Sequence, residues 1–340
     1  AEAEMLALAR DARPLLEDRL SRPRRVVPAV AWLADCVASD VGDGAVALLA
    51  DHAILPLVWT RDAYFVARAL LAAGRRDLVD AFLRWCFERA ARLDGRWWPR
   101  SSLATGEPKD RAFQLDQQLY PLLLLAETGG PAAERYRRAA EEQLDAVLAR
   151  ADGGLVATSE TPADDRLEQP FHFSSHVLLW KTVRALGRDA EPLRRLVRDR
   201  FTHGGRFAYA IGAGVRHYHD ANDLPTALAP AWGFCDADDD VWRATIAYAW
   251  SRENAAHFDG PLGGLGSLHT PHPWPLGDLQ RVVVARARRD EDAERDAWSR
   301  LGRVATWDGL LPEAYDEGDG SVASRHWFAW PVALRATLRR

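Results

Sequence analysis

Hydrophobic residues recur along most of this 340-residue chain at the spacing of an α-helix, and turns rich in Gly, Pro, Asp and Trp separate the runs. Gly74, Gly129 and Gly187 follow predicted helix ends, where glycine is favoured. Strand-like patterns are confined to two short segments, 155–158 and 207–211. The pattern predicts helices over residues 2–20, 24–39, 61–74, 76–92, 113–128, 131–151, 172–187, 190–202, 224–233, 238–252, 274–289, 291–304 and 326–339.

The predicted helices fall into two kinds that alternate along the chain. Nearly all-round apolar surfaces, typical of buried helices, occur over 61–74, 113–128, 172–187 and 326–339. Many Arg and Glu residues, typical of an outer layer, occur over 76–92, 131–151, 190–202 and 291–304. We find neither a fixed repeat period nor a flexible linker. We therefore predict an all-α fold, an (α/α)6 toroid of helical hairpins, as one domain over residues 1–340.

In such a toroid the loops before the inner helices should meet at one mouth. These loops contain most of the unusual polar residues of the chain, in segments 58–62, 114–116, 163–165, 219–223, 266–270 and 312–313. A functional site is therefore expected there.

Charge and composition exclude several classes of protein. The net charge is −5, with acidic and basic residues mixed, so no basic face indicates a nucleic-acid partner. We find no apolar run of about eighteen residues, as a membrane span would need, and no signal-peptide pattern at the first residues. Cys36, Cys86 and Cys235 lie far apart, so we expect buried thiols in a reducing compartment. The predicted location is cytoplasmic, and the oligomeric state stays open.

The fourteen tryptophans are more than core packing usually needs, because each indole N–H requires a partner. Sugar-binding sites use indole faces to cover the apolar side of a ring. Glu313 lies on a loop followed closely by the segment Arg325-His326-Trp327-Phe328-Ala329-Trp330. A carboxylate beside indoles is half of a glycosidase site, which needs two acids.

A second acid is available at Asp164-Asp165, before the predicted helix 172–187. The pair could simply cap that helix. Alternatively, two adjacent carboxylates cannot both ionise cheaply in a dry pocket, so one would hold a proton and act as general acid. Glu313 is either a solvated loop residue or a general base that polarises water. Inverting hydrolysis requires the two carboxyls to be roughly 6.5–9.5 Å apart, whereas about 5 Å indicates retention.

Other polar residues of these loops also have two interpretations. Such residues commonly cap helices and form turns. If the loops meet, the same side chains would hold hydroxyls of a terminal sugar, between tryptophans that wall the pocket. The expected binding residues are Arg61, Asp62, Asp116, Asp220, Asn222, His269 and Arg325, and the expected wall is Trp59, Trp274, Trp327 and Trp330.

Other chemistries find less support. The histidines at 217, 219, 269 and 272 match no strong zinc spacing, and we find neither a serine-nucleophile elbow nor a phosphate-binding Gly loop. Segments 164–168 and 236–239 have the form of the Asp-rich motifs of class I and class II terpene cyclases. Segment 236–240 also suits a helix N-terminus. A terpene cyclase stays an alternative, but we expect a small-molecule or oligosaccharide substrate and no metal or organic cofactor.

Several strings, in order from about residue 55 to 335, resemble those of glycoside hydrolase family 125. This family comprises metal-independent, inverting exo-α-mannosidases with an (α/α)6 barrel. The strings are Trp59-Thr60-Arg61-Asp62, Gln114-Leu115-Asp116, Pro162-Ala163-Asp164-Asp165, Asp220-Ala221-Asn222, segment 264–270 and segment 325–330.

The resemblance implies that the aspartate pair contains the general acid and that Glu313 is the base. The base loop departs from the family, because Pro312-Glu313-Ala314 stands where the family has His-Glu-Ser. The histidine would have supplied a hydrogen-bond donor facing the site. Family chemistry therefore carries over better than mannose specificity. An α-glucosidase or glucoamylase-like hydrolase, and a non-catalytic glycan-binding protein, remain alternatives.

Overall fold

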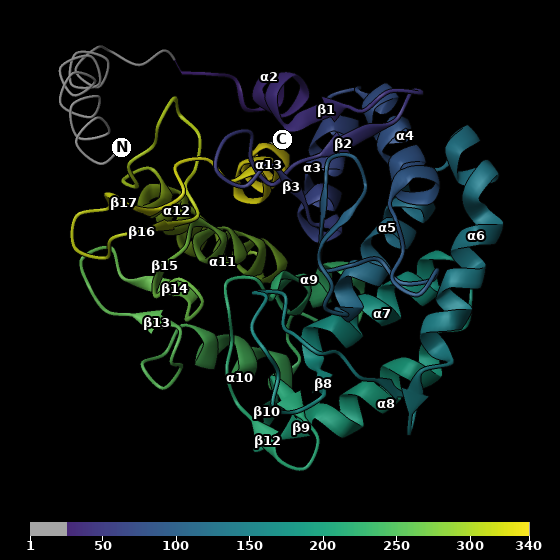
Figure 1. The fold of residues 1–340 in the computed structure, drawn as a ribbon. Coiled ribbons are helices and arrows are strands. Elements are labelled where there is room, and N and C mark those ends of the chain that lie inside the picture. Colours follow the sequence, from purple (N-terminus) through teal and green to yellow (C-terminus); the bar gives the residue numbers. More distant parts are fainter. Residues whose placement is uncertain (1–25, 340) are drawn as a thin grey trace, which may run out of the picture.

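The computed structural model describes residues 26–339. Six helices form its inner layer, and each contacts the next around a closed ring, with the last returning to the first (Figure 1). In order they are α3 (Thr60–Ala72), α5 (Leu115–Thr128), α7 (Phe173–Ala185), α9 (Leu224–Trp232), α11 (Pro275–Arg288) and α13 (Ala329–Leu338). The helices predicted to be inner are among them and are largely buried.

The outer layer follows the inner helices in chain order (Figure 1). It contains α4 (Arg76–Arg84), α6 (Gly130–Leu148), α8 (Glu191–Phe201), α10 (Asp240–Ala249) and α12 (Glu291–Leu301). The short α2 (Ala29–Trp32) packs against α13. Each outer helix buries one face and exposes the other, as the prediction of amphipathic outer helices required. The (α/α)6 arrangement is thus confirmed, and the single domain over residues 1–340 stays a prediction.

The all-α description was wrong in one respect, because short antiparallel strands join the helices. They are β1 (Ala38–Asp40), β2 (Val46–Leu48), β3 (Leu57–Val58), β4 (Ser101–Leu103), β5 (Pro108–Asp110), β6 (Ala151–Asp152), β7 (Leu155–Val156), β8 (Phe171–His172), β9 (Thr202–His203), β10 (Arg206–Phe207), β11 (Ala210–Ile211), β12 (Val215–Arg216), β13 (His257–Phe258), β14 (Gly264–Ser267), β15 (His272–Pro273), β16 (Ala314–Tyr315) and β17 (Val322–Ser324). Several of these have only two residues, too few for period-two alternation to be seen in the sequence.

Two predicted helix starts need correction. The last helix begins at Ala329, not at 326, which puts Pro331 in the first turn, where no intrahelical N–H bond is required. The prediction over 24–39 combined α2 with a π-helical turn, Leu33–Val37, and with β1. Cys36 lies on that turn and is exposed, so the expectation of three buried thiols was wrong for it. The helix predicted over 2–20 lies outside the described residues.

Helix ends follow the expected chemistry. Gly74, Gly129 and Gly187 all have positive φ, which a glycine adopts without steric cost. Asp239 caps α10, since its side chain accepts a hydrogen bond from the backbone N–H of Trp242 at 3.0 Å. The acidic string at 236–240 is therefore a helix N-terminus.

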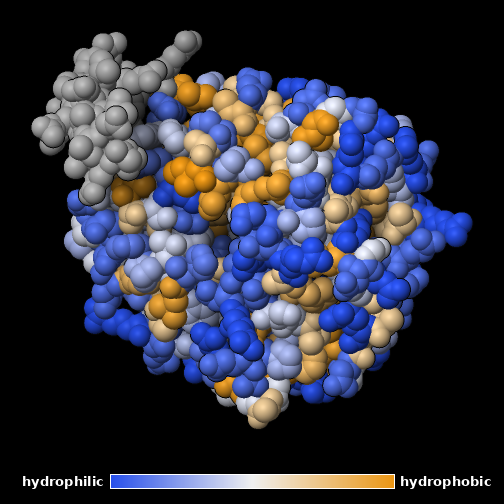
Figure 2. Space-filling model, in the orientation of Figure 1, coloured by the Kyte–Doolittle hydropathy of each residue, from blue (hydrophilic) through white to orange (hydrophobic). Residues whose placement is uncertain are grey.

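The face of the ring seen in Figure 1 is mostly hydrophilic around its edge, with scattered hydrophobic residues (Figure 2). Among the described residues, no helix is both long enough and apolar enough to cross a membrane.

Candidate active site

One cavity of about 150 Å³ opens where the loops before the inner helices meet. Its polar lining comes from five separate segments of the chain. Of the six loops that the sequence predicted, those before α3, α7, α9, α11 and α13 contribute, and the loop before α5 does not. The lining residues are Leu55, Trp59, Arg61, Asp62, Pro162, Ala163, Asp164, Asn222, His269, Trp274, Glu313, Arg325 and Phe328.

Asp164 reaches the cavity from a tight turn and does not cap α7, whose N-cap position is His172. Asp164 has φ +65, a left-handed conformation that aspartate tolerates better than most residues. Its Oδ2 accepts a hydrogen bond from the Trp59 indole at 2.9 Å. Its Oδ1 accepts one from the Gln114 amide at 2.7 Å and lies 3.6 Å from Arg61 Nη2. These contacts fix the direction of the carboxyl group.

Glu313 approaches the same cavity from the loop before β16 and is 8% exposed. The hydroxyl of Ser324 donates to its Oε2 at 2.7 Å. Arg325 Nη1 donates to its Oε1 at 3.3 Å. The backbone N–H of Glu313 also donates to the carbonyl of Arg325 at 2.9 Å. The Glu313 carboxylate therefore has two side-chain donors, Ser324 and Arg325, even though Pro312 stands where the resembled family has a histidine donor.

Arg61 and Asp62 lie side by side on the first turn of α3 and are both almost fully buried. Asp116, on α5, accepts a hydrogen bond from Arg61 Nη1 at 3.1 Å and does not line the cavity. Burial raises the pKa of Asp62 to about 6, against the opposing charges of Arg61 and Arg325. Arg61 Nε and Asp62 Oδ1 are 3.3 Å apart, yet neither has a hydrogen-bond partner.

Asp220 was expected to bind a sugar hydroxyl, but the structure gives it a different place. Its Oδ1 accepts from the backbone and side-chain N–H groups of Asn222, and its Oδ2 accepts from the Tyr218 and Ser267 hydroxyls. Asp220 does not line the cavity, whereas Asn222 does. Burial and the charge of Asp223 raise the pKa of Asp220 to about 6. Asp220 therefore holds Asn222 and the strand that carries Ser267.

Asp165 and His269 form a pair at the edge of the cavity. Asp165 Oδ1 is 3.0 Å from His269 Nδ1, and both side chains are 45% exposed. That hydrogen bond raises the pKa of His269. The expected dry pocket shared by Asp164 and Asp165 is absent here, because only Asp164 is among the lining residues.

Two of the four predicted tryptophan walls line the cavity, Trp59 and Trp274. The indole of Trp330 is fully buried behind it, stacked on Phe65 and beneath the Arg61 guanidinium, 5.3 Å away. Trp327 lies against His52 and Trp307, outside the lining. Phe328 takes the place that the sequence had suggested for these two indoles.

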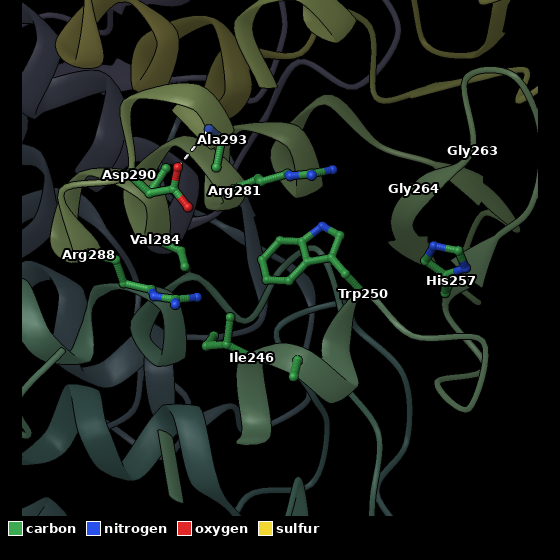
Figure 3. Close-up of a pocket in the computed structure, with 12 residues that line it drawn as sticks. Ile246, Trp250, His257, Gly263, Gly264, Arg281, Val284, Arg288, Asp290 and Ala293 are labelled. Atoms are coloured by element: carbon green, nitrogen blue, oxygen red, sulfur yellow. Dashed lines mark hydrogen bonds between the residues drawn. The ribbon is translucent and has the colours of Figure 1, made fainter. Parts of the chain in front are cut away.

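A larger hollow, of about 370 Å³, lies between α10, α11 and α12 (Figure 3). Its single carboxylate, Asp290, is committed to the helix start, since its side chain accepts a hydrogen bond from the N–H of Ala293 at 3.0 Å. Arg281, Arg288 and the indole of Trp250 surround the opening. This hollow contains no pair of acids and is unsuited to acid–base hydrolysis.

His272, Asp316 and Glu317 bring possible metal-ligand atoms within 4.8 Å of one another. Each already has a partner: His272 Nδ1 bonds to Glu317 at 2.9 Å, and Asp316 accepts from the N–H groups of Gly318 and Asp319. Turn formation and one ion pair account for the cluster.

Sequence reasoning missed several residues around the site. Gln114 belongs to the segment Gln114-Leu115-Asp116, which resembles the family, but it was not assigned to the site from the sequence, although its amide contacts Asp164. Leu55 and Phe328 line the cavity, and Asp51 and Ser324 support it from behind. No spacing signal marks the last two, because they depend on chain segments that meet only in the folded state.

Comparison with known proteins finds similar glycosidases. Residues 193–338 match the family described as metal-independent alpha-mannosidase (GH125). A search of curated proteins gives no match. The structure resembles a metal-independent α-mannosidase from Streptococcus pneumoniae, in a non-productive complex with α-1,6-mannobiose, with TM-score 0.74, 17% identity and 92% of each chain covered.

Two glucoamylases share the fold, with lower TM-scores. The enzyme from Saccharomycopsis fibuligera has TM-score 0.66 and 11% identity, with 92% of each chain covered. A bacterial glucoamylase complexed with acarbose has TM-score 0.61 and 17% identity, covering 84% of this chain and 48% of that one. Identities this low establish the fold alone. The carboxyl-terminal part of the chain, residues 193–338, accordingly matches the GH125 family, and the chain has the fold of known (α/α)6 glycosidases.

Proposed function

We propose that this protein removes a terminal α-mannose unit from a glycan by inverting hydrolysis. The observation that carries the proposal is that Asp164 and Glu313, 149 residues apart in sequence, line one small cavity. A volume of about 150 Å³ lies well below the roughly 300–1,000 Å³ of sites for drug-sized ligands. A cavity of this size suits one sugar ring and therefore attack at a chain end.

Unpaired polar atoms in the wall also support a sugar ligand. Arg325 Nη2 is buried without a hydrogen-bond partner, and Arg61 Nε and Asp62 Oδ1 have only their mutual ion pair at 3.3 Å; all three residues line the cavity. A buried polar group left unsatisfied costs about 1–3 kcal/mol. Sugar hydroxyls both donate and accept hydrogen bonds, so one ring satisfies donors and acceptors together.

The acid and base have distinct parts in the proposed mechanism. Asp164 donates a proton to the departing glycosidic oxygen; each of its oxygens retains a lone pair beyond those used by Trp59 and Gln114. Glu313, positioned by Ser324 and Arg325, removes a proton from the water that attacks the anomeric carbon on the opposite face. The product is the β-anomer of the released sugar.

Hydrolysis of α-1,6-mannobiose by the wild-type protein and two variants tests these roles. Glu313→Gln and Asp164→Asn keep the shape of each side chain and remove its acid–base function. Each should lower kcat roughly 10²- to 10⁴-fold. Maltose is the control substrate for a glucoamylase-like specificity. Wild-type rates in either variant would contradict the assignment of the acid and base. If the wild-type protein cleaved maltose faster than α-1,6-mannobiose, its specificity would be for glucose and not for mannose.

A further inference from the structure

Asp51 is a fully buried acid behind the cavity, outside every motif of the sequence. Its Oδ2 lies 3.3 Å from Arg325 Nε. Arg325 in turn donates to Glu313 at 3.3 Å through Nη1, and its guanidinium lies 4.2 Å from the centre of the Phe328 ring. One guanidinium thus lies between a buried acid and the candidate base.

The backbone of Arg325 is held in an uncommon conformation. Its φ is +37, a left-handed value rare for a residue with a side chain and costing about 1–3 kcal/mol. The same residue accepts the Glu313 N–H through its carbonyl at 2.9 Å, so backbone and side chain both contact the base. Nη2 remains buried, without a partner, in a residue that lines the cavity. Such strain persists only where surrounding contacts impose it.

We propose that Asp51 is a positioning residue, which holds the Arg325 guanidinium against Glu313 and aims its remaining N–H group at a substrate hydroxyl. This inference rests on the proposed function. Asp51 also accepts hydrogen bonds from the N–H groups of Ala53, Ile54 and Leu55. Because Leu55 lines the cavity, the Asp51 carboxylate contacts both the cavity wall, through Leu55, and the arginine that contacts Glu313.

Turn capping alone is the competing explanation, and Asp51→Asn separates the two. Asparagine keeps an oxygen for the turn N–H groups but offers Arg325 an amide in place of a charge. We expect kcat on α-1,6-mannobiose to fall roughly 10- to 100-fold, as for a misplaced catalytic group, with a smaller change in KM. Asp40→Asn is the matched control, since Asp40 also caps a turn, through the N–H of Gly42, but is not among the residues that line the cavity.

A double-mutant cycle with Arg325→Met completes the test. If Asp51 acts through Arg325, Asp51→Asn lowers both kcat and the thermal unfolding midpoint when it is the only substitution. In a protein that already carries Arg325→Met, the same substitution lowers neither quantity further. Additive losses, or an unchanged kcat in Asp51→Asn, overturn the proposal. If Asp51→Asn does not fold, Asp51→Glu, which keeps the charge and displaces the guanidinium by one methylene, faces the same criteria. If the wild type cleaves no α-mannoside, the proposed function fails, and the unfolding midpoints still decide whether the two residues are coupled.

Discussion

At the scale of single residues, the site combines side chains that the sequence identified with supports that it did not. Arg61 and Asp62 could be predicted because they follow Trp59 at the start of an apolar helix, and Glu313 because its loop precedes an aromatic segment. Their orientation could not, because it depends on contacts with residues far away in sequence. Asp116 and Asp220 show the difference, since both have the predicted chemical type but support the lining residues Arg61 and Asn222 from behind.

The pH dependence of stability follows from Asp62. Burial raises the pKa of Asp62 from 3.8 to about 6, so between these pH values the native state keeps a proton that the unfolded chain has lost. This contribution to stability is present at low pH and is lost as pH rises from about 4 through about 6. Asp62→Asn carries no such charge, so its stability relative to the wild type should rise by up to about 3 kcal/mol across that interval.

Urea unfolding of both proteins at several pH values measures this difference. Asp40→Asn, at an exposed turn, provides the control and should track the wild type throughout. A pH-independent difference for Asp62→Asn would show that Asp62 does not titrate in this interval.

At the scale of elements, helices could be predicted well and their connections poorly. The inner helices α5 and α7 lie within two residues of their predicted limits, because long apolar runs give a strong periodic signal. Strands such as β14 and β15 give no such periodic signal, because they form where two backbone segments approach closely. Gly266 pairs with Pro273 there, and its carbonyl accepts the N–H of Ala221, next to Asn222.

Gly266→Ala tests whether that close approach positions the site. A methyl group at Gly266 would lie 1.8 Å from the carbonyl oxygen of His272, so the strands must separate. We expect a loss of about 1–3 kcal/mol in the free energy of unfolding and a lower kcat/KM, because Ser267 and Asp220 shift with the strand. Chemical denaturation and hydrolysis assays measure both quantities.

Gly214→Ala is the control, as its nearest neighbour would be at an ordinary 3.5 Å. Equal effects of the two substitutions would mean that close packing of β14 against β15 is not required.

At the scale of the whole molecule, ring closure brings five separate loops together around one cavity. The sequence predicted this meeting, because alternating inner and outer helices place the loops before inner helices at the same end of a toroid. It did not predict the small size of the cavity, which depends on Leu55 and Phe328 and on the closing contact of α13 with α3. Under the proposed function, a cavity of about 150 Å³ would restrict hydrolysis to a chain end.

The anomeric form of the first product tests the central claim most directly. Proton NMR during the first minutes of hydrolysis of the methyl α-glycoside of α-1,6-mannobiose distinguishes newly released β-mannose from α-mannose before mutarotation mixes them, because the methyl mannoside left behind has no free anomeric centre. If Asp164 and Glu313 act from opposite faces of the ring with water between them, β-mannose appears first. Initial release of α-mannose would require a covalent intermediate and would contradict the account.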